Sequence, residues 1–219
     1  MHNSILCAGP IETAKALLDM VQTSTFWLTL LYSAIRICLG FMAGAILGLI
    51  LAWISYKSKL FAEFISPFVS AVKSIPVASF VIIILIWVGA SIMSAIVVSL
   101  VVFPIIYLNT LEGLRSTDIK LLQMAQVYKM RPLMKLKHIY LRSLRPFLIS
   151  SFSLAVGMSW KSGIAAEAIG RPRTSMGEGI YASKIYLETD KLFAWTICAI
   201  MLSFVFERIV KAVLRRVTK

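Results

Sequence analysis

The longest uncharged run in the chain restricts the fold more than any other feature. Val77–Leu108 contains 32 residues without an Asp, Glu, Lys or Arg. A single α-helix of that length would extend roughly 48 Å, whereas the hydrocarbon core of a bilayer is about 30 Å thick. The run must therefore supply two membrane spans, and the sequence VGAS at Val88–Ser91 is the natural break. We expect these spans at about Phe64–Trp87 and about Ser91–Leu111.

Three further segments are long and apolar enough to cross a bilayer. They lie at about Phe26–Ser55, Pro146–Ala166 and Lys191–Phe206. Hydrophobic residues make up 59% of the 219 residues and charged residues 15%, and the mean hydropathy is +0.84. Ordinary soluble domains of this size are far more polar. The sequence therefore predicts an all-α protein, a polytopic membrane helical bundle of about five transmembrane helices, with residues 1–219 forming one domain.

The charges are divided unevenly between the two ends of these spans. Residues 57–63, 112–145 and 207–219 would share one face and carry net charges of +1, +6 and +4. Residues 1–25 and 167–191 would share the other face and carry −1 and 0. Because positive loops stay in the cytoplasm, we expect a cytoplasmic carboxyl terminus and an extracytoplasmic amino terminus. The formal charge of +13 is thus explained without a nucleic-acid partner.

Side chains suited to catalysis or metal binding are scarce. Cys7, Cys38 and Cys198 stand apart without a CxxC or a nearby His, and the only histidines are His2 and His138. The spans hold no Asp or Glu near their centres, and no GxxxxGK[ST] phosphate loop occurs. We therefore expect no catalytic residues and no metal on this chain. An alternative is a stand-alone secondary transporter, although such proteins usually show repeated halves and intramembrane acids.

The strongly basic loop 112–145 has the pattern of two short helices. Ser116–Asp118 supplies side chains that favour a helix start, and apolar residues then recur at steps of three and four. Pro132 disfavours helical backbone at Arg131 and suits the first turn of a new helix. The sequence predicts a helix, a bend and a second helix that leads into the next span. A loop that lies on anionic lipid headgroups is the alternative.

The order and spacing of several segments carry a family resemblance. They are SAIRICLGFMAGAILGLILA, FISPFVSAVKSIPVASFVIIILIWVG, FPIIYLNTLEGLRSTDIKLLQMAQVYKM, SWKSGIAAEAIG and DKLFAWTICAI. With these segments the chain resembles, from Gly9 to its end, the permease subunits of binding-protein-dependent ABC importers of the type I fold. The nitrate/taurine/sulfonate branch of that family is the most similar.

The resemblance implies a function and a set of partners. The chain would be the non-catalytic transmembrane subunit of an ATP-driven importer in the bacterial inner membrane. ATP and Mg would be bound by cytoplasmic ABC ATPase subunits, a second permease subunit would complete a homo- or heterodimer, and an extracytoplasmic solute-binding protein would deliver the solute. A sulfonate, taurine or nitrate is the expected solute, and a vitamin precursor (thiamine pyrimidine or riboflavin) is the alternative. Family members usually have one more amino-terminal span, so we expect either a short variant or a missing span.

By the same resemblance, loop 112–145 contains the coupling helix that contacts the ATPase. Gln123–Ala125 stands where the family has Glu-Ala-Ala, so Gln replaces an acid that can meet a basic residue of the ATPase. Lys129 stands where the family has a Gly that eases the bend, and we therefore expect Arg131–Pro132 to bend the chain instead. The expected ATPase-coupling residues are Gln123, Met124, Ala125, Tyr128, Lys129, Arg131 and Pro132.

Charged and proline residues inside the spans mark the expected translocation path. An unpaired charge in a span is costly, so Arg36, Lys73 and Lys161 should face protein, water or an interface, and three cations suit an anionic solute. Snorkelling or contact with helix-end carbonyls is the alternative for Arg36 and Lys73. Pro76 either lines the path or only kinks its helix. The expected path and gate residues are Lys73, Pro76, Ser159, Trp160, Lys161 and Glu167.

Two further features have both a functional and a purely structural interpretation. Glu167 lies at the outer end of its span, where it either holds an external gate or forms a structural ion pair. Gly40, Gly44 and Gly48 recur every four residues and allow another helix to approach closely. We expect that helix within the same subunit, with a helix across a dimer as the alternative.

Overall fold

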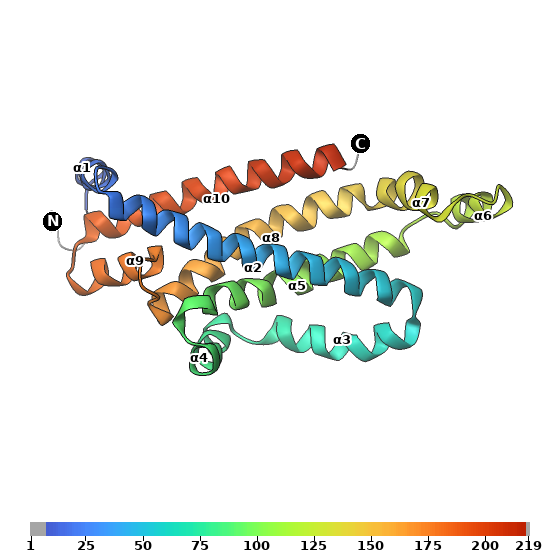
Figure 1. Cartoon of the computed structure of the whole chain (residues 1–219), viewed down its shortest axis with the longest axis horizontal. Helices are drawn as coiled ribbons and strands as arrows, with labels where there is room; N and C mark the ends of the chain where they lie inside the picture. Colours follow the sequence, from blue (N-terminus) through green and yellow to red (C-terminus); the bar gives the residue numbers. More distant parts are fainter. Residues whose placement is uncertain (1–7, 218–219) are drawn as a thin grey trace.

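The computed structural model describes residues 8–217, and every regular element in that range is a helix (Figure 1). Cys7 and His2 lie outside the described residues. The helices are α1 (Pro10–Val21), α2 (Ser24–Lys57), α3 (Lys59–Ser74), α4 (Val77–Val88), α5 (Ala90–Arg115), α6 (Ile119–Val127), α7 (Pro132–Lys135), the π-helical segment η1 (Leu136–Tyr140), α8 (Leu141–Gly170), α9 (Met176–Ile185) and α10 (Thr189–Val217).

The four longest helices, α2, α5, α8 and α10, run along the long axis of the molecule (Figure 1). Helix α5 packs between α2 and α8, and α10 packs against the other side of α8. Helices α1 and α9 lie at one end of this bundle, and α6 and α7 lie at the other (Figure 1). The α2–α3 connection, the α6–α7 segment and the end of α10 all lie toward this second end. The three basic segments are thus grouped together, as the charge pattern predicted.

Two of the described helices, α2 and α5, are each long and apolar enough to span a membrane. Helices α3 and α4 meet the same test only as a pair, and their axes differ by 100°. Helices α8 (30 residues) and α10 (29 residues) also have bilayer length but carry more charges. The all-α membrane bundle is therefore confirmed. Length and hydropathy support two or three of the five expected spans.

The expected span at about Phe64–Trp87 is not one helix but is sharply broken at Pro76. Helix α3 starts earlier, where the Ser58 Oγ accepts a hydrogen bond from the Phe61 N–H (3.3 Å). It ends before Ile75, whose φ of −74° and ψ of 131° are extended. The ring of Pro76 excludes helical backbone at the residue before it, so the chain leaves α3 and begins α4 in a new direction. The segment is two short helices that do not share an axis.

The three spaced glycines of α2 lie against α5. A Cβ at Gly40 would overlap the carbonyl oxygen of Ala95, and a Cβ at Gly44 would lie 2.6 Å from the carbonyl oxygen of Ser99. A Cβ at Gly48 would lie 3.0 Å from the carbonyl oxygen of Phe103, on the next turn of α5. Backbones that approach this closely leave room only for glycine. The structure therefore places these residues in a helix contact within the subunit.

The largest cluster of buried apolar side chains lies where α2, α5, α8 and α10 meet. These side chains exclude water from the centre of the bundle and give it most of its apolar burial. They include Ile37, Phe41, Val98, Val102, Val156 and Trp160.

Candidate functional site

The loop expected to couple to an ATPase folds as a helical hairpin with defined caps. At the start of α6 the Asp118 Oδ1 accepts a hydrogen bond from the Lys120 N–H (2.8 Å). At its end the Met130 N–H donates to the Ala125 carbonyl (2.9 Å), and the Lys129 N–H donates to the Gln126 carbonyl (3.1 Å). These two bonds are the Schellman pattern, which requires a left-handed residue between helix and loop. The helix, bend and second helix predicted from the sequence are therefore present.

The bend itself is made by a different residue from the one expected. Lys129 has φ 48°, in the left-handed region, whereas Arg131 is extended, with φ −59° and ψ 144°. The expectation that Arg131 and Pro132 bend the chain in place of a glycine is wrong. The Lys side chain occupies the glycine position and adopts the glycine conformation, because the two capping bonds fix the backbone there.

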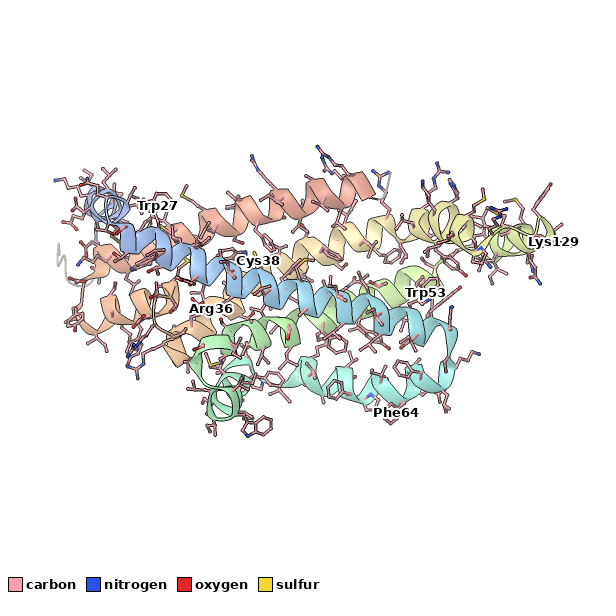
Figure 2. All side chains as sticks on the ribbon, in the orientation of Figure 1. Trp27, Arg36, Cys38, Trp53, Phe64 and Lys129 are labelled. Carbon is pink, nitrogen blue, oxygen red and sulfur yellow. The ribbon has the colours of Figure 1, made fainter. Side chains whose placement is uncertain are left out.

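The hairpin projects beyond the end of the bundle, with Lys129 at its tip (Figure 2). Ala125 is buried, but its neighbours on α6 leave large apolar side chains in the open: Ile119 is 69% exposed, Val127 78% and Tyr128 77%. Single apolar residues on a surface are common, but several on one short helix usually mark a protein contact. The other expected coupling residues, Gln123, Met124, Arg131 and Pro132, are exposed as well.

An aromatic cluster fixes the base of the hairpin to α2. The ring centroid of Tyr140 lies 5.4 Å from that of Trp53 and 5.7 Å from that of Tyr56, both edge-to-face. Burial, with a hydrogen bond to Tyr56, raises the pKa of Tyr140 to about 12. The Lys135 Nζ lies 5.8 Å from the centroid of the Tyr140 ring, close enough for a cation–π contact. These contacts join the base of the hairpin directly to a long helix of the bundle.

A polar stripe follows one face of α3, opposite the end of α5. Its members are spaced four, three, four and three residues apart, which is one face of a helix. A second stripe, formed by Leu60, Phe64 and Phe68, is apolar and exposed, and Phe64 points away from the bundle (Figure 2). The polar stripe consists of Lys59, Glu63, Ser66, Ser70 and Lys73.

Three adjoining hollows run along the polar stripe. The widest, about 760 Å³, lies at the basic end of the molecule and is lined by Lys59, Glu63, Ser66 and Arg115. The next, about 270 Å³, shares Ser66 and Arg115 with it and extends to Lys73. The third, about 280 Å³, shares Lys73 with the second and is lined mainly by apolar residues of α4, α5 and α8. Together they form a groove between α3 and α5, which we call the α3–α5 groove.

The expected path and gate residues do not all line this groove. Lys73 lies in it, and Pro76 caps the start of α4 beside it. Ser159 is buried, and its Oγ donates to the Val156 carbonyl (2.7 Å). Trp160 belongs to the buried core. Lys161 is exposed and lines a separate hollow of about 400 Å³ between α8, α9 and α10.

Glu167 lies at the opposite end of the bundle, fully buried. Its Oε2 accepts hydrogen bonds from the Ser33 Oγ (2.7 Å) and the Gly177 N–H (3.4 Å), and its Oε1 lies 3.6 Å from the Arg36 guanidinium. The same Ser33 Oγ accepts from the Met176 N–H (2.8 Å). Arg36 also donates to two carbonyls of the α8–α9 loop, at 3.3 and 3.5 Å. This cluster ties α2, α8 and α9 together at one point.

Sequence reasoning missed Arg115 and the polar stripe as parts of the site. Arg115 was counted only as one more positive charge of the cytoplasmic loop, but it ends α5 and lines the groove. The spacing from Lys59 to Lys73 is visible in the sequence and could have indicated a polar helix face. Only Lys73 of this face was singled out from the sequence, because it was considered as a lone charge in a span and not as part of a helix face.

Comparisons with known proteins agree with this geometry. The family model described as binding-protein-dependent transport system inner membrane component matches residues 44–219. A Bacillus subtilis protein named as an aliphatic sulfonates transport permease is 24% identical over 211 residues, covering 96% of this chain and 76% of the relative. The taurine transport system permease protein of Escherichia coli is 23% identical over 196 residues, covering 89% of this chain and 71% of the relative.

A solved structure supports the fold. In the inward-facing conformations of the MetNI methionine ABC transporter, a chain superposes with a TM-score of 0.65 at 17% identity, covering 88% of this chain and 94% of that chain. Identity that low carries information about the fold alone. Since the family model covers most of the chain, the protein belongs to the binding-protein-dependent transport system inner membrane components, the permease subunits of ABC importers.

Proposed function

We propose that this chain forms half of the translocation path of an ATP-driven importer for a small anionic solute of the sulfonate class. An extracytoplasmic binding protein delivers the solute, and a second permease subunit completes the path. Cytoplasmic ABC ATPase subunits bind ATP and Mg and hydrolyse the nucleotide, so this chain performs no catalysis itself. The amino terminus lies outside the cytoplasm, and the end of the bundle with α6 and α7 lies inside.

The observation that carries this proposal is the projecting α6–α7 hairpin. Apolar side chains are exposed on this hairpin, and those of Ile119, Val127 and Tyr128 are each more than two thirds exposed. They suit a groove on another protein, where a short helix inserts its apolar face. The caps at Asp118 and Lys129 keep α6 helical although it has only 9 residues.

The connection between hairpin and bundle supports a mechanical role. When ATP closes the two ATPase subunits, each moves the α6 that it holds. The contacts of Tyr140 with Trp53 and Tyr56 pass this displacement to α2, and the close contact of α2 with α5 carries it along the bundle. The path then changes between inward-open and outward-open arrangements as packed helices move relative to one another.

The names of the relatives and the charge of the groove both favour a sulfonate. One relative is named for aliphatic sulfonates and one for taurine, and both solutes carry a sulfonate group. Lys59, Lys73 and Arg115 line the α3–α5 groove, and Glu63 is the one carboxylate among its lining residues. An excess of cations is expected along the path of an anion.

Co-purification tests the proposed function. The full chain, tagged and expressed from its own chromosomal position, should retain an ABC ATPase and an extracytoplasmic protein that mass spectrometry can identify, and the latter should bind an alkanesulfonate. Replacing residues 119–131 with a Gly/Ser segment of the same length should abolish both ATPase retention and uptake. Arg208→Gln, an exposed site on α10, is the matched control. Full uptake with the Gly/Ser segment, or labelling of Lys137 only from outside the cell, would contradict the proposal.

A further inference from the structure

Two cations from different helices face the same hollow. Lys73 belongs to the last turn of α3 and Arg115 to the last turn of α5, and both line the 270 Å³ hollow together with Ser66 and Ser70. Among residues 8–217 there are three ion pairs, and they involve Arg36, Lys191 and Lys211. Neither Lys73 nor Arg115 forms an ion pair within the described part of the subunit. The hollow has no carboxylate among its lining residues. Its lining is therefore net positive, and Glu63 is a carboxylate of the adjoining hollow that shares Arg115.

The position of the polar stripe argues against lipid as its neighbour. Helix α3 presents Leu60, Phe64 and Phe68 on one side, all highly exposed, and this apolar stripe suits contact with acyl chains or another helix. The stripe that holds Ser66, Ser70 and Lys73 is also exposed, but it borders the hollow between α3 and α5. Hydroxyl and ammonium groups in hydrocarbon are costly without partners. The hollow beside them therefore suits water or a polar ligand rather than acyl chains.

The neighbouring hollow has the opposite character. It adjoins Lys73 and continues away from Arg115, and its volume is about 280 Å³. Apart from Lys73 and Asn109, its lining is apolar and comes from α3, α4, α5 and α8; it includes Val72, Phe80, Leu100, Pro104, Leu154 and Met158. A cationic hollow joined to an apolar one is complementary to a molecule with an anionic head and a short hydrocarbon tail.

We propose that the α3–α5 groove contains an alkanesulfonate-binding site, with the sulfonate held by Lys73 and Arg115 and the alkyl chain in the adjoining apolar hollow. A sulfonate has three oxygens that accept charge-assisted hydrogen bonds from an ammonium and a guanidinium. The hydroxyls of Ser66 and Ser70 supply further donors. The choice of a sulfonate rests on the proposed function, whereas the preference for an amphipathic anion rests on the groove alone.

Thiol labelling in membranes tests the site without any transport step. Ser70→Cys is introduced into the full chain after its three native cysteines are replaced by serine or alanine. Membranes are then treated with sulfonatoethyl methanethiosulfonate, which is itself an alkanesulfonate, or with the cationic trimethylammonioethyl reagent. The ratio of the anionic to the cationic labelling rate should be at least about tenfold higher at Ser70→Cys than at a site without nearby cations, since Lys73 and Arg115 attract the anion and repel the cation. Thr25→Cys, exposed at the other end of the bundle, should show no such preference.

Removing either cation should weaken the preference of Ser70→Cys for the anionic reagent. Lys73→Gln or Arg115→Gln should each lower the ratio of the two labelling rates severalfold, and Lys73→Arg or Arg115→Lys should retain it. Arg208→Gln is the matched loss of charge outside the groove. An unchanged ratio in both Gln variants would overturn the proposal. Each charge variant is also made with Thr25→Cys, and loss of labelling at that site shows that the variant does not insert. If the Gln variants fail to insert, Lys73→Arg and Arg115→Lys decide. A loss of the labelling preference in Lys73→Arg would then contradict the assignment.

Competition identifies the ligand chemistry. Butanesulfonate should protect Ser70→Cys at lower concentration than methanesulfonate, by up to about fourfold for each buried methylene. Equal protection by the two would refute the position of the alkyl chain. Anionic headgroups are the other source of an oxyanion, so labelling is repeated in nanodiscs with and without phosphatidylglycerol. Protection by that lipid and none by butanesulfonate would assign the cations to headgroups and overturn the proposal. Because labelling needs no ATPase, a failure here with intact uptake leaves the proposed function standing.

Discussion

Replacing Lys129 with glycine should stabilise the hairpin that projects from the bundle. Lys129 holds a left-handed backbone, with φ 48°, at the end of α6, and two capping hydrogen bonds depend on it. An L-residue in this region is strained because its Cβ approaches the following carbonyl oxygen. Glycine has no Cβ and is the usual residue at this position of a Schellman cap.

The expected size of the effect follows from two opposing terms. The left-handed conformation costs an ordinary residue about 1–2 kcal/mol, and glycine loses about 0.5–1 kcal/mol more conformational entropy on folding than alanine does. The midpoints of the two ranges leave a net gain of about 0.75 kcal/mol for glycine, equivalent to a shift of about two- to fivefold in the opening equilibrium of α6. The gain is local, because α6 has 9 residues and depends strongly on its caps.

Amide hydrogen exchange of the purified permease complex measures this directly. Amides of residues 119–127 should exchange about two- to fivefold more slowly in Lys129→Gly than in Lys129→Ala. Both variants lack the positive charge near the helix carboxyl end, which itself has a favourable interaction with the helix dipole. The difference in exchange rate between the two variants therefore reports the cost of the left-handed backbone at position 129.

Equal exchange in the two variants would refute the reasoning, since it would mean that the backbone at position 129 is not left-handed in solution. A second site provides an independent comparison. Leu187 has φ 55° after α9, where the Glu188 N–H donates to the Ser183 carbonyl (2.9 Å). Leu187→Gly should slow exchange in α9 relative to Leu187→Ala, and should leave α6 unchanged.

Three other perturbations have definite outcomes. Gly40→Ala places a methyl against the backbone of α5 and should destabilise the bundle by about 1–3 kcal/mol, seen as a lower thermal midpoint in detergent. Gly157→Ala, whose new Cβ would meet no neighbouring helix within 4 Å, should leave the midpoint unchanged or raise it slightly, since alanine favours a helix interior more than glycine does. Ser33→Ala removes a hydroxyl that makes two buried hydrogen bonds and should cost about 1–3 kcal/mol, with Ser33→Thr retaining more of the stability by the same assay. Trp53→Ala should accelerate exchange in Leu136–Tyr140 by loosening the base of the hairpin, whereas Trp53→Phe should do so less.

The helical hairpin shows how far the sequence alone leads. Asp118 and Pro132 are strong local signals, and both act where they were expected to, as a helix cap and as the first residue of a helix. The residue that makes the bend was not predictable in the same way. Lysine rarely occupies a left-handed position, because its Cβ disfavours that backbone conformation. The two capping hydrogen bonds at the end of α6 hold Lys129 there, and they are seen only in the structure.

Long-range contacts explain the remaining gaps. Nothing local in the sequence brings Trp53 to Tyr140 or Ser33 to Glu167, because each pair is joined only when whole helices pack. The sharp turn at Pro76 was expected as a kink, but its 100° size depends on where α4 finds its packing partners. Lys73 and Arg115 line one hollow only because α5, which follows α4 in the chain, runs back along α3.

The glycine contact between α2 and α5 has a mechanical consequence. Because the backbones of α2 and α5 are in direct contact at Gly40, Gly44 and Gly48, the two helices should resist sliding past each other and move as one rigid body. A displacement of the α6–α7 hairpin that reaches α2 through the contact of Tyr140 with Trp53 would then be passed to the opposite end of both helices almost undiminished.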